Sequence, residues 1–162
     1  MSSLKRSARG FALALALGLP ASAALAEGPF SSLSGYWTGG GTIATKNGVS
    51  ERIRCRATYA VNDPGTALNQ SLRCASDSYR LEITGNLSVI NGALSGNWTE
   101  ATRHATGQVS GGASATEIMA RVDGVGFSAG LNVRFKGGQQ SISIRPTMGS
   151  DVTAVTITLR KG

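Results

Sequence analysis

The chain has 162 residues, of which 41% are hydrophobic and 15% charged, and its formal net charge is +7. The hydrophobic fraction is too high for a disordered chain, and the length allows one domain or two very small ones. The charged fraction lies well below the roughly 25% of an average soluble domain. Gly, Ser, Thr and Asn fill the polar positions instead, which is typical of all-β proteins with many turns.

Residues 1–26 have the pattern of a secretory signal peptide. Three basic residues precede an apolar run over residues 11–19, which is too short to span a bilayer as a helix of about 20 residues. An Ala-x-Ala site over residues 24–26 predicts cleavage after Ala26, with the Ala-Ser-Ala over residues 21–23 as the second choice. An N-terminal membrane anchor is the alternative interpretation of the whole segment.

Cleavage would leave an N-terminal extension over residues 27–35 and a barrel domain over residues 36–162. The signal segment holds three of the 16 basic residues and none of the 9 acidic ones, so the remaining chain carries a net charge of +4. This charge indicates a mild preference for anionic surfaces and is too small for a nucleic-acid footprint. No second apolar run follows, so we expect a periplasmic or secreted product with no transmembrane segment.

Beyond the signal segment, apolar and polar residues alternate with period two between glycine-containing turns, and no convincing amphipathic helix is found. The sixth predicted segment is interpreted as either a strand or a loop. The strands that we expect span residues 36–45, 49–61, 66–76, 79–90, 93–101, 107–112, 115–123, 126–136, 139–147 and 152–160.

The predicted hairpins indicate one continuous apolar face, because paired side chains of an antiparallel hairpin share a face. Hairpins centred at residues 137–138 and at residues 123–124 place apolar side chains opposite one another, as at Val133 and Ile142. The last two strands pair Ile142 with Ile157. The predicted fold is all-β: a single antiparallel meander β-barrel of about 8–10 strands with an apolar interior. A transmembrane barrel would need outward aromatic girdles, and these are missing from the sequence.

Cys55 and Cys74 are the two cysteines of the chain, and they lie symmetrically about a β-turn at residues 63–66. This symmetry places them directly opposite one another on neighbouring strands, at a Cα separation near ~5 Å. Because an exported chain meets an oxidising compartment, we expect one cross-strand disulfide. Two buried or redox-active thiols are the alternative, although the sequence has no Cys-x-x-Cys motif.

The opposite face of the same hairpin is rich in arginine. Guanidinium groups bind phosphate and carboxylate groups bidentately, so this face is a candidate patch for contact with anions of the cell envelope. A solvated surface face is the alternative interpretation. The arginines of the predicted patch are Arg52, Arg54, Arg56 and Arg73.

Aromatic side chains are predicted on the interior face, where they would either line a ligand cavity or fill the barrel. A register that places Ile43 opposite Ile53 puts Trp37 opposite Tyr59, near one end of the barrel. The five aromatic residues predicted inside are Trp37, Tyr59, Trp98, Phe127 and Phe135.

The sequence offers little for catalysis, and we expect no enzyme activity, no cofactor and no metal site. His104 is the only histidine, and it follows Glu100 and Arg103. A Glu and a His form an acid–base pair in some enzymes, which is the enzymatic alternative, but nothing in the sequence orients these two. The triplet Gly39-Gly40-Gly41 lacks the Lys-Ser/Thr of a phosphate-binding loop and is interpreted as a bulge or a sharp coil in a strand.

A short repeat, Leu-Ser-Gly-x-Trp-Thr, occurs at residues 33–38 and 94–99 and contains both tryptophans of the chain. In the first copy, Gly35-Tyr36-Trp37 resembles the Gly-x-Trp in the first strand of the calycins, which include the lipocalin and avidin families, and residues 92–96 resemble an avidin hairpin. Arg160 resembles the calycin arginine that packs over this tryptophan, although the alternation places Arg160 on the polar face. The resemblance implies a closed meander barrel with a ligand cavity, while avidin-like biotin binding would need more tryptophans.

Small bacterial periplasmic inhibitors of metalloproteases share this barrel and its Gly-x-Trp, and Ser31-Ser32-Leu33 resembles their N-terminal Ser-Leu segment. The chain also resembles small exported bacterial proteins with no assigned activity. We therefore expect a non-enzymatic barrel of the periplasm or cell envelope that binds a small or lipidic ligand in an apolar interior. The alternative is a protein-interaction or inhibitor-type envelope module with a filled barrel.

Overall fold

A computed structural model describes residues 26–162, which form ten β-strands and one short 3-10 helix, η1, over Ser31–Leu33. Every predicted strand is present, with bounds within two residues of those expected, and the ambiguous sixth segment is a strand. The predicted signal peptide lies outside the described residues, except for Ala26. The strands are β1 Gly35–Thr45, β2 Ser50–Val61, β3 Ala67–Ala75, β4 Arg80–Ile90, β5 Ala93–Glu100, β6 Ala105–Ala113, β7 Glu117–Gly124, β8 Phe127–Lys136, β9 Gln139–Met148 and β10 Val152–Lys161.

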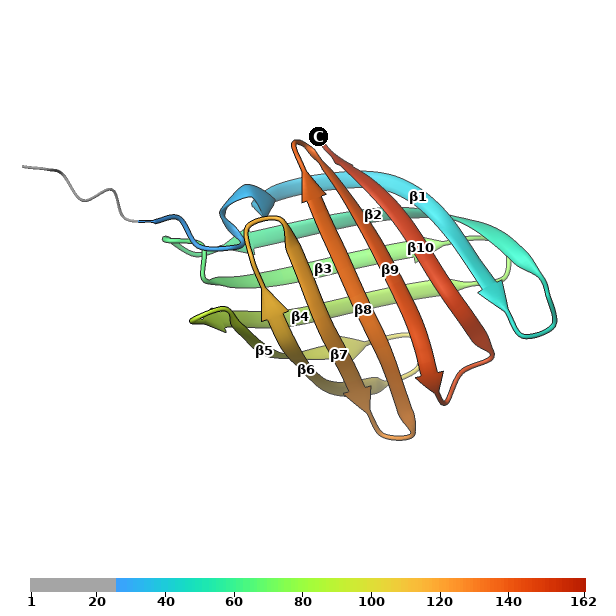
Figure 1. The fold of residues 1–162 in the computed structure, drawn as a ribbon. Helices are drawn as coiled ribbons and strands as arrows, with labels where there is room; N and C mark the ends of the chain where they lie inside the picture. The colour runs from blue at the N-terminus through green and yellow to red at the C-terminus, as the bar shows by residue number, and fades with distance from the viewer. Residues whose placement is uncertain (1–25) are drawn as a thin grey trace, which may run out of the picture.

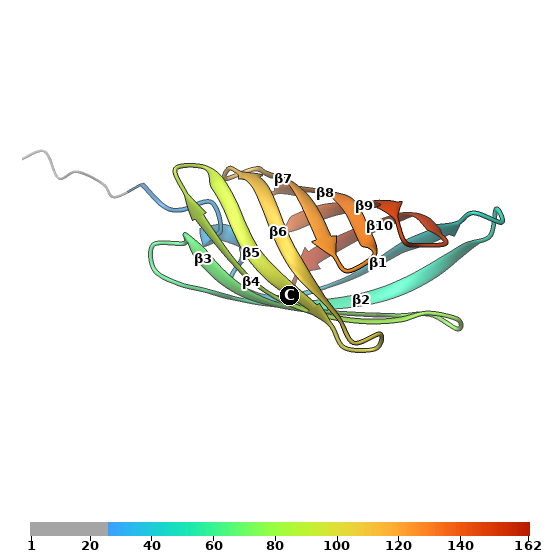
Figure 2. The ribbon, with the colours of Figure 1, turned by 90° about the horizontal axis from the view of Figure 1, so that it is seen from below.

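The strands form one closed antiparallel barrel in meander order. Each strand pairs with the next along the chain, and β1 closes the barrel by pairing with β10. In Figure 1 the strands β7–β10 cross in front of β2–β4, and Figure 2 shows the same barrel turned by 90°. Within residues 26–162, no helix is long and apolar enough to cross a membrane. The predicted fold class is confirmed.

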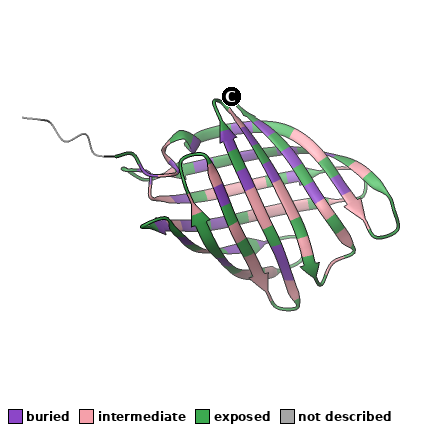
Figure 3. Cartoon of the chain, viewed as in Figure 1, coloured by how far each residue is buried: buried purple, intermediate pink, exposed green. Residues whose placement is uncertain are grey.

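Side chains alternate between the interior and the exterior of the barrel, as the pleat of a strand requires. The alternation is clearest in β2, where Ile53, Cys55, Ala57 and Tyr59 are buried and the residues between them are more exposed. Figure 3 shows the corresponding bands of buried and exposed residues along the strands. The buried side chains of the strands form one hydrophobic core inside the barrel.

The predicted register between β1 and β2 is wrong by two residues. Trp37 lies opposite Ala57 rather than Tyr59, and Ile43 lies opposite Glu51. The cause is the four-residue loop between the strands, which is organised by hydrogen bonds to an asparagine side chain and is centred one residue earlier than predicted. Because a shift of two residues keeps every side chain on its face, Trp37 still packs edge-on against Tyr59, with ring centroids 6.3 Å apart.

The predicted turn between Asp123 and Gly124 is also wrong. Strand β7 continues to Gly124, which pairs with Phe127 of β8. The next two residues make the turn, and they include Gly126, whose φ of 67° favours glycine. Gly124 has a different role: a Cβ there would lie 2.9 Å from the Trp98 ring, so this glycine makes room for the indole. The predicted pairing of β8 with β9 and of β9 with β10 is confirmed.

The glycine triplet over residues 39–41 serves a close approach between β1 and β10. A Cβ on Gly41 would lie 1.7 Å from the carbonyl oxygen of Thr156, so no side chain fits at this point of the seam. Pairing is regular through the triplet, and the register shift in β1 falls later, between Ala44 and Thr45. The glycines are therefore a point of close strand contact, and the bulge predicted as one alternative is absent from residues 39–41.

One end of the barrel is closed by the segment over residues 26–34, which we call the N-terminal cap. Figure 1 shows the cap lying beside the start of β1 and the turn between β2 and β3. Phe30 and Leu33 of the cap are buried in the core, and the Phe30 backbone N–H donates to the Gly65 carbonyl oxygen at 2.9 Å. The Trp37 Nε1–H donates to the Leu33 carbonyl oxygen at 2.8 Å, which joins the cap to the first strand.

The cation over Trp37 is a lysine. Arg160, which the calycin resemblance assigned to this place, is exposed on the outside of β10 opposite Thr38. The next residue, Lys161, places its ammonium group 5.7 Å from the centre of the Trp37 ring. The Lys161 Nζ also donates to the Ser32 carbonyl oxygen at 3.1 Å. The lysine therefore joins the last strand to the N-terminal cap.

The predicted disulfide is confirmed. Cys55 of β2 and Cys74 of β3 are directly opposite one another, with Cα atoms 4.1 Å apart, and they are bonded. Neither is free, so the described residues contain no free thiol. The bridge holds β2 and β3 together in the wall of the barrel.

Free-thiol titration of the denatured, unreduced protein is expected to find no thiols, because Cys55 and Cys74 are paired in the fold. Reduction is expected to lower the free energy of unfolding by about 3 kcal/mol, because it releases a closed loop of this length in the unfolded chain. Denaturant titration with and without reductant measures this loss. Two thiols per chain before reduction would contradict the disulfide.

Candidate functional site

A cavity of about 610 Å³ occupies the barrel between the N-terminal cap and the loops at the opposite end. Its volume lies within the roughly 300–1,000 Å³ of typical small-molecule sites. Four loops at the end away from the cap contribute to its lining, and we call this end the mouth. The loop residues at the mouth are Tyr79 between β3 and β4, Arg103 and His104 between β5 and β6, Val125 and Gly126 between β7 and β8, and Gly149 and Ser150 between β9 and β10.

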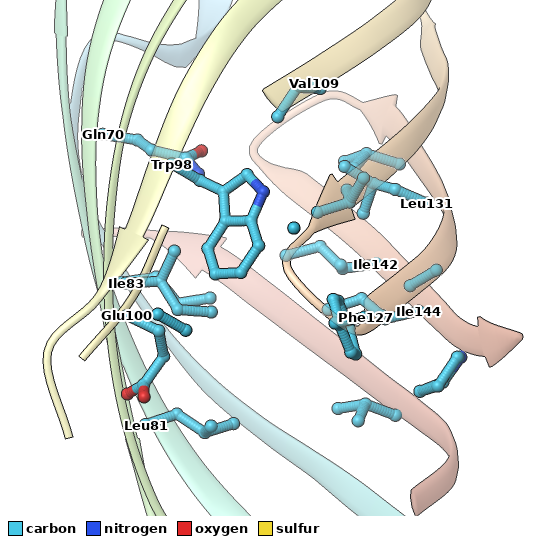
Figure 4. Close-up of a pocket in the computed structure, with 18 of the residues that line it drawn as sticks. Gln70, Leu81, Ile83, Trp98, Glu100, Val109, Phe127, Leu131, Ile142 and Ile144 are labelled. Carbon is cyan, nitrogen blue, oxygen red and sulfur yellow. The ribbon is translucent and has the colours of Figure 1, made fainter. Parts of the chain in front are cut away.

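The cavity wall is mainly apolar. Figure 4 shows the Trp98 indole projecting into the space between Ile83 on one side and Leu131 and Ile142 on the other. Phe127 packs edge-on against Trp98, with ring centroids 6.0 Å apart. A surface of this kind favours apolar ligands by removing their surface from water, with little demand on their shape or orientation.

The structure separates the aromatic residues that were predicted inside the barrel. Tyr59, Trp98, Phe127 and Phe135 all line the cavity. Trp37 is buried under the N-terminal cap, outside the cavity lining. Trp37 therefore packs the closed end beneath the cap, whereas the other four aromatic side chains lie along the cavity wall and leave space between them.

A polar pair lies inside the closed end of the cavity. The Tyr59 hydroxyl donates to Gln140 Oε1 at 2.9 Å, across the barrel from β2 to β9. Burial raises the pKa of the Tyr59 phenol to about 12, so the group stays neutral at physiological pH. Sequence reasoning did not select Gln140 as a site residue. The available signal was its position opposite Phe135 in the predicted hairpin, which placed a polar residue on the apolar face.

Glu100 organises the loop between β5 and β6 at the mouth. Its carboxylate accepts hydrogen bonds from the backbone N–H groups of Glu82, Thr102 and Arg103 and from the Thr102 hydroxyl, at 2.7–3.2 Å. In Figure 4 the carboxylate oxygens turn toward the strands of the wall. Burial raises the pKa of this carboxyl, but the hydrogen bonds outweigh burial and hold the pKa below its usual range.

The enzymatic alternative needs Glu100 and His104 to act as a pair. His104 is exposed in the same loop with a φ of 53°, and no hydrogen bond between the two side chains is found in the part of the chain that the structure describes. The Glu100 carboxylate is already occupied by its hydrogen-bond donors. Across residues 26–162, no group of three or more His, Cys, Asp or Glu side chains could hold a metal ion.

Glu100→Gln is expected to lower the free energy of unfolding at pH 7 by about 1–3 kcal/mol, because a charged acceptor of several hydrogen bonds is lost. The folded-state pKa of Glu100 is depressed, so its contribution is complete above the unfolded pKa near ~4.3 and is lost as the pH falls through the folded pKa. In denaturant titrations from pH 7 to pH 3, the difference in free energy of unfolding between the wild type and the variant should shrink as the pH falls. A constant difference down to pH 3 would contradict this role.

The predicted arginine patch lies on the outside of the barrel. Its four members are exposed: Arg52, Arg54, Arg56 and Arg73. Arg56 and Arg73 are directly opposite one another, and Thr38, the β1 partner of Arg56, pairs on its other side with Arg160. The ion pairs found within residues 26–162 involve none of these arginines. Like charges facing one another destabilise a sheet, and on its other side Arg73 lies opposite Glu82 of β4.

Binding of the protein to vesicles that contain an anionic phospholipid is expected to weaken as salt rises, because exposed charges are screened over ~8 Å at physiological ionic strength. Replacing Arg56 and Arg73 by glutamine should weaken it further at low salt. Arg145→Gln, an exposed change on β9, is the matched control and should have less effect. Vesicle co-sedimentation measures the bound fraction. Binding that does not change with salt concentration would support the interpretation of the arginine face as a solvated surface.

The comparisons with known proteins identify the barrel and leave the family open. No protein-family model matches the chain, and no curated protein matches it. Among solved structures, Rv2717c from M. tuberculosis aligns with a TM-score of 0.66 at 16% identity, covering 82% of this chain and 94% of that one. The S-type phycobiliprotein lyase CPES from Guillardia theta aligns with a TM-score of 0.53 at 11% identity, covering 82% and 90%. These neighbours are ten-strand antiparallel barrels of the calycin-like kind, so the likeness is one of fold.

Proposed function

We propose that the protein is a non-enzymatic binding protein of the bacterial periplasm or cell envelope that holds a small apolar or lipidic ligand inside its barrel. The observation that carries this proposal is the cavity of about 610 Å³ with its mainly apolar wall. A barrel whose side chains filled the interior would leave no such space. The likeness in fold to calycin-like barrels fits a binding role.

The absence of catalysis is part of the proposal. The buried carboxylate nearest the mouth, on Glu100, is held by backbone N–H groups. This arrangement supports a structural role for Glu100, since the same lone pairs are not free for a substrate. Other polar side chains of the lining, among them Gln70, Asn97 and Thr106, stand in a wall that is mainly apolar.

Export rests on the signal-like segment over residues 1–26 and is supported by the disulfide, because disulfides persist in oxidising compartments. Cell fractionation of the host, followed by intact-mass measurement, tests it. We expect the protein in the periplasmic or secreted fraction with Glu27 as its first residue. A cytoplasmic protein of full length would refute the export proposal and leave the cavity argument intact.

Ligand binding is tested with N-phenyl-1-naphthylamine, a neutral apolar probe that fluoresces when it leaves water. Wild-type protein should bind the probe, and Leu131→Trp should weaken binding by at least about tenfold, because the added ring occupies the cavity that Leu131 lines. Ser141→Trp is the matched control, because Ser141 faces outward on β9, and it should bind like the wild type. Equal binding by all three proteins would place the probe outside the barrel and refute the proposal.

Native mass spectrometry of protein purified from its own host adds the second test. A bound lipid or other small apolar molecule would appear as a mass adduct that Leu131→Trp loses. A second candidate function, an envelope-interaction module, is favoured by the arginine face alone. Vesicle binding without any adduct or probe binding would support this candidate in place of the ligand-binding protein.

A further inference from the structure

The closed end of the cavity contains a buried hydrogen-bond donor that has no protein partner. Gln140 is 1% exposed and lines the cavity. Its Oε1 accepts from the Tyr59 hydroxyl, whereas its Nε2 has no hydrogen-bond partner within residues 26–162. Nearly all buried polar groups in proteins are paired, and an unpaired buried donor is costly. This donor therefore points to a group that binds from the cavity.

No protein group within residues 26–162 accepts a hydrogen bond from Gln140 Nε2. In the sheet it lies between Phe135 of β8 and Leu159 of β10, both buried and apolar. Leu33 of the N-terminal cap lines the same cavity. The Tyr59 hydroxyl donates to Oε1 and accepts no hydrogen bond from Nε2. Because Gln140 lines the cavity, the cavity is the side from which an acceptor for Nε2 would come.

The charges of the cavity decide which acceptor fits. Its acidic and basic lining residues, Glu100, Arg103 and His104, belong to the end of β5 and the loop that follows, at the mouth. The closed end presents the neutral phenol of Tyr59 and the neutral amides of Gln140 and of Gln70, which lies opposite Tyr59 in the sheet. A carboxylate or phosphate brought there would lose its hydration without meeting a cation, which is strongly unfavourable. A carbonyl oxygen of a ketone, ester or amide accepts the same hydrogen bond without bringing a charge.

We propose that the closed end of the cavity binds the neutral carbonyl oxygen of an otherwise apolar ligand, with Gln140 Nε2 as the donor and Tyr59 holding the amide in place. The inference rests on the proposed binding function and adds its ligand class. The ligand enters through the mouth with its carbonyl end leading, and its apolar remainder lies along Trp98 and Leu131.

The test uses two naphthalene probes that differ in one group. The first is 6-propionyl-2-dimethylaminonaphthalene, which carries a ketone, and the second is 2-dimethylaminonaphthalene, which lacks it. Wild-type protein should bind the ketone more tightly. Gln140→Leu should weaken ketone binding by about tenfold and change binding of the second probe by less than about twofold. Tyr59→Phe keeps the Nε2 donor and should retain part of the preference for the ketone.

The infrared carbonyl stretch of the ketone bound to wild-type protein gives a readout that needs no variant. A hydrogen bond from Nε2 should lower the stretch relative to that in an alkane solvent. An alkane-like stretch, or equal losses of both probes in Gln140→Leu, would overturn the carbonyl proposal while leaving the apolar binding function standing. Failure of the wild type to bind either probe would refute both.

Discussion

Replacing Trp37 by alanine is expected to lower the free energy of unfolding by about 3–5 kcal/mol, the usual cost of truncating a buried indole. Trp37 is 1% exposed. It joins three parts of the closed end, because it donates to the Leu33 carbonyl oxygen of the cap, packs edge-on against Tyr59 and lies under the Lys161 ammonium group. Domains of this size have a total stability of commonly about 5–15 kcal/mol, so the loss is a large part of the total.

Thermal and denaturant unfolding measure this effect, and two changes serve as controls. Tyr36→Ala alters the neighbouring residue, which is exposed on the outer face, and should change the midpoint little. Trp98→Phe keeps an aromatic ring in the cavity wall and should lower the midpoint less than Trp37→Ala does. If Trp37→Ala left the midpoint unchanged and abolished binding of a ligand or partner, Trp37 would be a contact residue and its structural role would be wrong.

Gly41→Ala is expected to lower the free energy of unfolding by about 3 kcal/mol, at the upper end of the usual cost of overpacking. The added Cβ would lie 1.7 Å from the Thr156 carbonyl oxygen. That oxygen belongs to the backbone of β10, so relief requires the two strands to move apart. The seam between β1 and β10 closes the barrel, and a change there affects the whole fold.

Gly130→Ala is the matched control for Gly41→Ala, because it makes the same chemical change in β8 at a position where a Cβ meets nothing within 4 Å. It should leave the unfolding midpoint unchanged or raise it slightly, since alanine reduces the freedom of the unfolded chain. Denaturant titration of both variants gives the comparison. Equal effects of the two substitutions would mean that the seam tolerates a side chain and that close approach at Gly41 is not required.

The sequence alone determined the strands, the face of each residue and the disulfide. These are local properties: alternation has a period of two residues, and turn chemistry sets where a strand ends. Cys55 and Cys74 could be paired because the Pro-Gly turn between them sets their register. The inward position of Gln140 was also visible in the hairpin that pairs it with Phe135.

Two registers could not be determined from the pattern. Between β1 and β2 the structure differs by two residues, and between β7 and β8 the turn lies beyond Gly124. Shifts by an even number of residues leave every side chain on its original face, so the hydrophobic pattern is equally satisfied by each of these pairings. Between β7 and β8 a tertiary contact chose the register, since Gly124 is required beside the Trp98 ring. Between β1 and β2 the loop hydrogen bonds to the Asn47 side chain chose it.

The cavity was decided only by the tertiary structure. The sequence predicted that Trp98 and Phe135 face the interior, but it was compatible with both a ligand cavity and a filled barrel. Interior volume depends on how side chains from all ten strands and the N-terminal cap pack together, and no local pattern carries that information. The same holds for the unpaired Nε2 of Gln140, because a donor is known to lack a partner only when every neighbour from distant strands has been placed around it.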